Sequence, residues 1–70
     1  MKNSFTEYLI KNGWIEVSCL TYQFQENKSV ELFFETSNQI ELYINKKRIS
    51  GKYLKSIEDL VSFLSDNKLI

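Results

Sequence analysis

Histidine is absent from this chain, and cysteine occurs only once, as Cys19. The lack of histidine removes the commonest general base of enzymes and the commonest protein ligand for metal ions. A single cysteine excludes a disulfide within the chain and a zinc site built from cysteines. Neither Cys19 nor any serine has an evident activating partner, so nucleophilic catalysis lacks its starting point. The sequence therefore predicts a protein that is not an enzyme and needs no metal or other cofactor.

Proline is absent as well, although we draw no functional conclusion from that, and the two glycines, Gly13 and Gly51, stand alone. Isolated glycines cannot form the phosphate-binding loop of a nucleotide site. Long apolar runs are missing, so no membrane span is expected. The first residues, MKNSFTEY, lack the apolar segment of a signal peptide. Together with the lone cysteine, this predicts a cytoplasmic protein without a membrane partner.

The residues that are present have the composition of a small folded domain. The chain has 70 residues, of which 43% are hydrophobic and 26% charged, as expected for a globular rather than a disordered protein. A domain of this size buries only about 60% of the surface of its extended chain. We predict a single α+β domain over residues 1–70, with room for a binding surface but not for a deep catalytic cleft.

The segment Ser29–Asn45, SVELFFETSNQIELYIN, predicts a β-hairpin at the centre of the fold. Apolar residues recur at every second position in both halves, which places them on one buried face. Pairing Phe34 with Ile40 keeps both apolar sets on that face. It also avoids the unfavourable pair of Glu35 with Glu41 that a neighbouring register would create.

Two tight turns are predicted around this hairpin. Thr36–Asn38 forms its loop, with Asn38 in the left-handed conformation, which asparagine tolerates. Asn45 and Lys46 form a second turn, which leads into a short strand near Lys47–Ser50. The pairs expected across this second turn are Leu42 with Ile49 and Tyr43 with Arg48.

The segment Trp14–Gln25 predicts the first strand, but its alternation changes phase midway. Apolar residues up to Cys19 follow one parity, and those from Leu20 onward follow the other. A β-bulge near Ser18–Leu20 would return both sets to the inward face. The alternative is that the strand begins only after an irregular stretch at Trp14–Val17.

A helix is predicted on each side of the strands. The first covers Ser4–Asn12, because Ser4 and Glu7 match a capping box and Gly13 is suited to end the helix. After a connector at Gly51–Lys55, Ser56 begins the last helix, which carries apolar residues at helical spacing.

The predicted fold is therefore α+β, in the order helix–β–β–β–(short β)–helix, with both helices against an antiparallel β-meander. The predicted core consists of Phe5, Leu9, Val17, Val30, Leu32, Phe34, Ile40, Leu42, Ile44, Leu60, Val61 and Leu64.

The opposite face of the sheet is the first candidate for function. Phe33 and Tyr43 lie on it diagonally, among three acidic residues, and an uncovered aromatic patch of this kind is typical of a protein interface. Alternatively, the first helix or a second copy of the chain covers this face. The interface candidates are Phe33, Tyr43, Glu31, Glu35, Glu41 and, at the junction of helix and strand, Trp14.

The basic segment 46–55 is the alternative candidate, for nucleic-acid binding. Its cations would neutralise phosphates, and Tyr53 would stack on a base. The candidates here are Lys46, Lys47, Arg48, Lys52, Tyr53 and Lys55. The helix–strands–helix order is similar to that of the double-stranded RNA-binding domain. That family, however, has lysines at the start of its second helix, where this chain has Ser56, Ile57, Glu58 and Asp59.

The small size, the composition and the lack of a recognisable set of catalytic residues together favour a module that binds a protein partner. In these respects the chain resembles phage and mobile-element inhibitors of host defence nucleases, such as anti-CRISPR proteins. That resemblance implies an acidic face that imitates nucleic acid. Acidic residues outnumber basic ones in residues 1–45, and the reverse holds in residues 46–70. We therefore also predict a two-fold homodimer in which acidic and basic patches meet.

Overall fold

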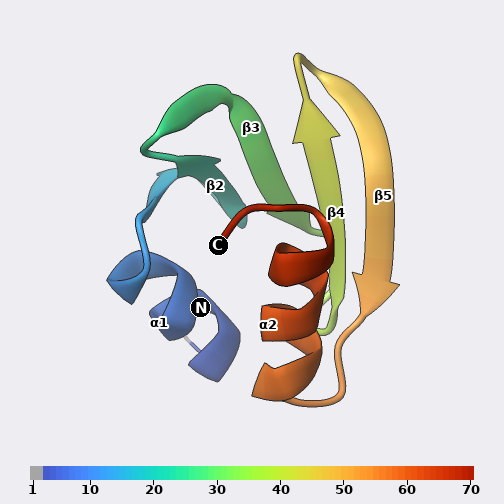
Figure 1. Ribbon diagram of the computed structural model, residues 1–70. Coiled ribbons are helices and arrows are strands. Elements are labelled where there is room, and N and C mark those ends of the chain that lie inside the picture. The colour runs from blue at the N-terminus through green and yellow to red at the C-terminus, as the bar shows by residue number, and fades with distance from the viewer. Residues whose placement is uncertain (1–2) are drawn as a thin grey trace.

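The computed structural model describes residues 3–70, and the alternating central segment forms the middle of its sheet (Figure 1). Helix α1 precedes five strands, and helix α2 follows them. The strands form an antiparallel meander in the order β1-β2-β3-β4-β5, which confirms the predicted α+β class. The elements are α1 (Ser4–Lys11), β1 (Trp14–Ser18), β2 (Thr21–Phe24), β3 (Asn27–Phe34), β4 (Gln39–Ile44), β5 (Lys47–Tyr53) and α2 (Ile57–Asp66).

The register of the central hairpin is the predicted one, with Phe34 opposite Ile40 across β3 and β4. The left-handed conformation expected for Asn38 is wrong, because Asn38 is not among the described residues with positive φ. Instead, the hydroxyl of Thr36 accepts hydrogen bonds from the amides of Asn38 and Gln39 at 3.3 and 3.1 Å. The side-chain amide of Asn38 donates to the carbonyl of Leu54 at 2.8 Å. These bonds hold the loop without a left-handed residue at Asn38.

The single first strand predicted for residues 14–25 is wrong, because the chain reverses at Cys19 and Leu20. Ser18 pairs with Thr21, so β1 and β2 form a second hairpin. Leu20 adopts φ 58° in this turn, a conformation that non-glycine residues seldom adopt. The change of parity therefore marks a turn. The register of β1 also shifts between Glu16 and Ser18, next to the position where the bulge was expected.

The turn into β5 is confirmed, but the strand is longer than predicted. Asn45 and Lys46 have φ 53° and 68°, as the preferred two-residue hairpin turn requires. Tyr43 faces Arg48 as expected. Leu42 faces Ser50 rather than Ile49, because the register shifts between Leu42 and Tyr43. The extra residue leaves Ile49 52% exposed. The chain then continues as strand to Tyr53, where a connector was expected.

Local hydrogen bonds at both helix starts explain where the helices begin. The capping box of α1 lies one residue earlier than predicted: Asn3 accepts from the amide of Thr6, and the hydroxyl of Thr6 accepts from the amide of Asn3, both at 3.0 Å. Gly13 follows with φ 95°, as expected. At α2 the predicted cap is present, because Ser56 accepts from the amide of Asp59 at 3.4 Å.

The end of α2 turns the chain back toward the core. Lys68 adopts φ 59°, and its amide donates to the carbonyl of Ser65 at 3.0 Å, while the amide of Leu69 donates to the carbonyl of Leu64 at 2.8 Å. These two bonds form a Schellman motif, with lysine in the position that glycine usually occupies. Leu69 is consequently buried, whereas Ile70 is 74% exposed.

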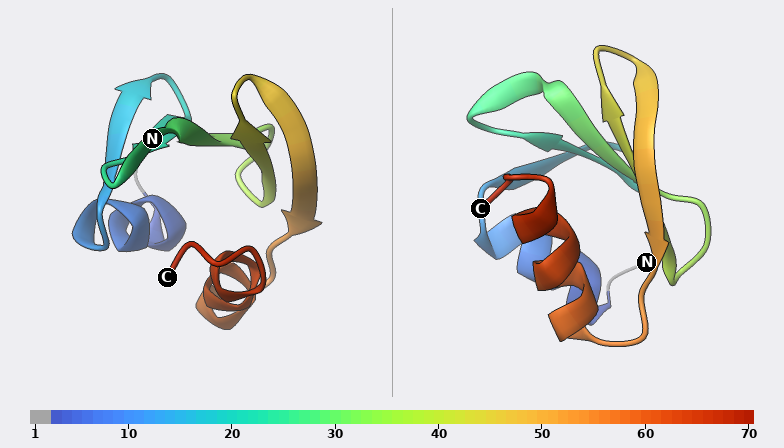
Figure 2. Two further views of the ribbon diagram at one scale, coloured as in Figure 1. Left: turned by 45° about the horizontal axis from the view of Figure 1, so that its top comes forward. Right: turned by 45° about the vertical axis from the view of Figure 1, so that its right-hand side comes forward.

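Both helices pack against the concave face of the curved sheet (Figure 2), and the core lies between them. Most predicted core residues are buried there. Val17 is an incorrect assignment, at 47% exposed, because it lies in the irregular part of the edge strand β1. Ile44 and Val61 are half-buried. The buried core residues missing from the predicted set are Trp14, Tyr22, Leu54, Phe63 and Leu69.

Within residues 3–70, no helix has both the length and the apolar character needed to cross a membrane.

Candidate interaction face of the sheet

The convex face of the sheet, which we call the outer face, lies away from both helices, and no element within residues 3–70 covers it (Figure 2). The strand registers place its residues in rows that cross the sheet. One row consists of Ile15, Gln23, Glu31, Tyr43 and Arg48. The next consists of Ser18, Thr21, Phe33, Glu41 and Gly51.

Aromatic and aliphatic side chains stand at several points of this outer face. Phe33 and Tyr43 lie diagonally across β3 and β4, as the sequence predicted, and both are half-buried. Ile15 on β1 is 46% exposed, and Tyr53, opposite Gln39 at the end of β5, is 58% exposed. The outer face therefore offers apolar contact area on both edge strands as well as at its centre.

Glu41 occupies the middle of the outer face, yet its residue exposure is only 7%. Arg48 donates from Nε to one carboxylate oxygen at 2.5 Å, and Gln39 donates from Nε2 to the other at 2.9 Å. Burial alone would raise the pKa of Glu41, but the hydrogen bonds from Gln39 and Arg48, together with the charge of Arg48, lower it overall. Glu41 is therefore held as a carboxylate within a bonded group rather than as a free acid.

Gly51 provides the space for this ion pair. A Cβ at position 51 would lie 2.6 Å from Oε1 of Glu41 and 2.7 Å from Nη2 of Arg48, closer than atoms approach without displacement. The backbone of Gly51 does not have a positive φ, so glycine is needed here for close approach rather than for conformation.

We expect Arg48→Ala to lower the free energy of unfolding by about 1–2 kcal/mol at pH 7, because it leaves a shielded carboxylate with one donor fewer. Arg48 is itself half exposed, and solvent screening keeps the loss modest. Gly51→Ala should displace the same pair, so the double variant should lose less than the sum of the two single variants. Urea denaturation of the four proteins measures this, and strict additivity would contradict the proposed role of Gly51.

The pH dependence of the Arg48→Ala effect has a definite sign. The pKa of Glu41 is lowered from 4.5 in the folded chain, so its pairing stabilises the fold above that pH. The stabilisation is lost as the pH falls through the folded pKa. The difference between wild type and Arg48→Ala should therefore shrink in acid.

The acidic character predicted for this face is partly neutralised within the chain. Besides the Glu41–Arg48 pair, Lys46 approaches Glu31 at 3.4 Å. The side chain of Glu31 is only 17% exposed, whereas that of Lys46 is 84% exposed. Glu35 lies at the exposed end of the hairpin. Two of the three carboxylates expected to form an acidic patch thus have a basic partner.

Trp14 does not belong to the outer face, although it does lie at the junction of α1 and β1. It pairs with Phe24 on the concave side and is 2% exposed. The two rings stack with centroids 4.6 Å apart. The sequence offered no means of placing Trp14, because the parity of β1 relative to the central hairpin depends on the turn at Cys19–Leu20.

The residues of the basic segment are divided between the two faces of β5. Lys47 and Lys52 stand opposite Ile44 and Ile40, whose side chains are on the concave face, whereas Arg48 and Tyr53 stand on the outer face. Lys46 lies in the preceding turn, and Lys55 follows the strand, where it is exposed. The structure thus does not gather these side chains into one basic surface.

Among the residues that the structure describes, no group of three or more acidic or cysteine side chains is placed to hold a metal ion. The chain matches no protein-family model, and neither curated proteins nor solved structures give a match.

Proposed function

We propose that this chain is a non-enzymatic protein-binding module that acts through the outer face of its sheet. The observation that supports this is the combination of half-buried and exposed apolar side chains with charges that are already paired. The centres of protein interfaces are depleted of free charge and enriched in aromatic residues and arginine. The aromatic contact area comes from Phe33, Tyr43 and Tyr53. The arginine is Arg48, whose charge is already paired with the carboxylate of Glu41.

The kind of partner follows from the same surface. Because Lys46 and Arg48 already pair with carboxylates of their own chain, they offer less charge to the acidic patch of a second copy. We therefore favour a partner of different sequence over the predicted homodimer. Inhibition of a host defence nuclease in the cytoplasm, as anti-CRISPR proteins perform it, is one form of this proposal. Such an inhibitor would bind the nuclease through apolar contacts more than by imitating the charge of a nucleic acid.

The test compares a double variant of the outer face, Phe33→Ala with Tyr43→Ala, with a matched control elsewhere on the surface. The control is Glu58→Ala on the exposed side of α2. Wild type and the two variants are immobilised and exposed to cell lysate. The affinity of the captured protein for each of them is then measured directly. Losing two central aromatic residues should weaken binding at least about 100-fold, while the control binds like wild type.

Circular dichroism must first show that the double variant is folded. A partner that the folded double variant retains at full affinity, or the capture of no specific protein, would contradict the proposal.

Nucleic-acid binding by the basic segment is the alternative result. It predicts that wild-type protein shifts DNA or RNA at low salt, and that Lys47→Ala with Arg48→Ala weakens this binding regardless of sequence. A polarisation titration with both nucleic acids distinguishes the two roles.

A further inference from the structure

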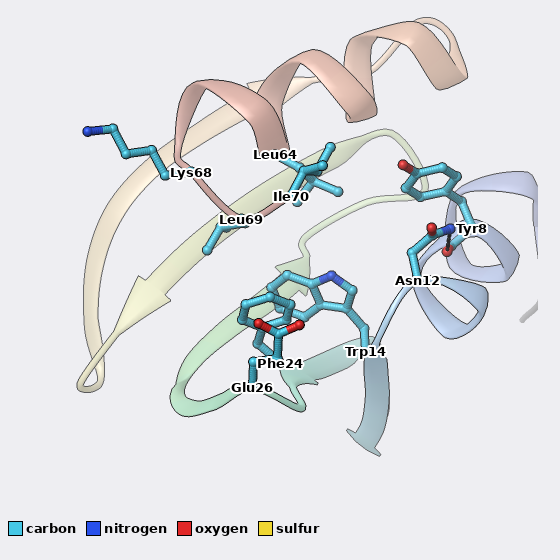
Figure 3. Close-up of a pocket in the computed structure, with 9 residues that line it drawn as sticks. All are labelled: Tyr8, Asn12, Trp14, Phe24, Glu26, Leu64, Lys68, Leu69 and Ile70. Carbon is cyan, nitrogen blue, oxygen red and sulfur yellow. Dashed lines mark hydrogen bonds between the residues drawn. The ribbon is translucent and has the colours of Figure 1, made fainter.

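A pocket of about 280 Å³ lies on the side of the sheet opposite the proposed interaction face. It is bounded by the end of α1, by the first two strands, and by the residues that follow α2 (Figure 3). Its apolar lining comes from Tyr8, Trp14, Phe24, Leu64, Leu69 and Ile70. Because these residues come from elements far apart in the sequence, the pocket exists only in the folded chain.

Trp14 supplies a polar group inside this apolar lining. The residue is 2% exposed, and its indole nitrogen lies on the edge of the ring that faces Tyr8 and the last residues of the chain (Figure 3). Every fully buried side-chain nitrogen or oxygen within residues 3–70 has a hydrogen-bond partner. The indole N–H of Trp14 makes no hydrogen bond to a side chain or backbone of these residues, so its nitrogen is not one of the fully buried atoms. Because this nitrogen borders the pocket, its N–H is available there as a donor that no acceptor among residues 3–70 occupies.

The charges at the rim restrict what the pocket would accept. Glu26, from the turn after β2, lines the pocket beside the stacked rings of Trp14 and Phe24. The ammonium of Lys68 extends away from the other lining residues (Figure 3). An anionic ligand would thus be repelled by the carboxylate of Glu26 without a nearby cation to compensate. The ligand atom that accepts a hydrogen bond from the indole N–H should therefore belong to a neutral group.

We propose that this pocket binds a small, neutral aromatic molecule that carries one carbonyl acceptor. The ring packs against the Trp14–Phe24 stack and Leu69, and the carbonyl accepts from the indole N–H. The pocket volume of about 280 Å³ is just below the usual range for small-molecule sites, which limits the ligand to about one ring with a short substituent. The proposal is independent of the protein-binding role, because the two sites lie on opposite sides of the sheet.

The single tryptophan of the sequence makes the test direct, because one indole N–H resonance reports on the pocket. Three probes of similar size are titrated by NMR: acetophenone, its isostere isopropylbenzene, which lacks the acceptor, and benzoate, which is charged. We expect acetophenone to move the indole resonance and to bind about tenfold more tightly than isopropylbenzene, the value of one neutral hydrogen bond. Benzoate should bind most weakly.

Two variants complete the experiment. Trp14→Phe keeps a ring but removes the donor, so the preference for acetophenone over isopropylbenzene, followed through the amides of Leu69 and Ile70, should disappear. The outer-face variant Phe33→Ala with Tyr43→Ala should bind acetophenone like wild type. The proposal is overturned if no probe binds at millimolar concentration, if wild type fails to prefer acetophenone, or if Trp14→Phe keeps that preference.

Discussion

Replacing Leu42 with alanine is expected to lower the free energy of unfolding by about 2–5 kcal/mol. Leu42 is 1% exposed and stands opposite Leu32 at the centre of the sheet, where both side chains face the helices. The loss combines the transfer of its apolar atoms with the cavity that a close-packed core cannot fill by relaxing. Urea denaturation at equilibrium measures the change.

Ile49→Ala is the matched control, because the two possible registers of β5 predict opposite results for it. In the regular register Ile49 would face Leu42 in the core, and its truncation would also cost several kcal/mol. In the structure Ser50 takes that place, and Ile49 is 52% exposed. We therefore expect Ile49→Ala to change stability by less than about 0.5 kcal/mol. Equal losses for both variants would show that the register shift is absent.

Leu54→Ala is expected to have an effect of similar size, about 2–5 kcal/mol, although the sequence predicted only a connector at this position. Leu54 is fully buried. Its amide donates to the carbonyl of Asn38 at 2.7 Å, and its carbonyl accepts from the side-chain amide of Asn38 at 2.8 Å. These bonds tie the end of β5 to the loop before β4 and direct the leucine side chain into the core.

Tyr53→Ala is the control for this second prediction, because the neighbouring residue points to the opposite face and is 58% exposed. Its truncation should cost less than about 1 kcal/mol, the range of strand preferences at exposed positions. A loss near zero for Leu54→Ala, or a larger loss for Tyr53→Ala, would mean that the chain leaves the sheet with the other parity.

The candidate interaction face was only partly predictable. Its diagonal pair, Phe33 and Tyr43, follows from alternation within one hairpin, because neighbouring strands share their faces residue by residue. The neutralisation of Glu41 does not follow, since it requires the register shift in β5 and the absence of a side chain at Gly51. The pocket beside Trp14 was not predicted at all, because it is formed by segments from both ends of the chain.

The sequence by itself determined the elements whose signals are local. Four features depend on side chains that are close together in the sequence. They are the register of the central hairpin, the turn at Asn45–Lys46, the end of α1 at Gly13 and the cap at Ser56. Such short-range preferences do not depend on where the segment packs in the fold, so the amino-acid sequence was sufficient to predict these four features.

Only the tertiary structure decided the two chain reversals at Leu20 and Lys68, because at each of these positions the local cost of the turn is similar to the gain from packing. Leu20 and Lys68 adopt left-handed conformations that cost each residue about 1–2 kcal/mol. The two turns bring Leu20 and Leu69 against the core, and the burial of a leucine contributes a comparable amount. The reversal that separates β1 from β2, and the return of the last residues to the core, are therefore decided by packing between distant segments.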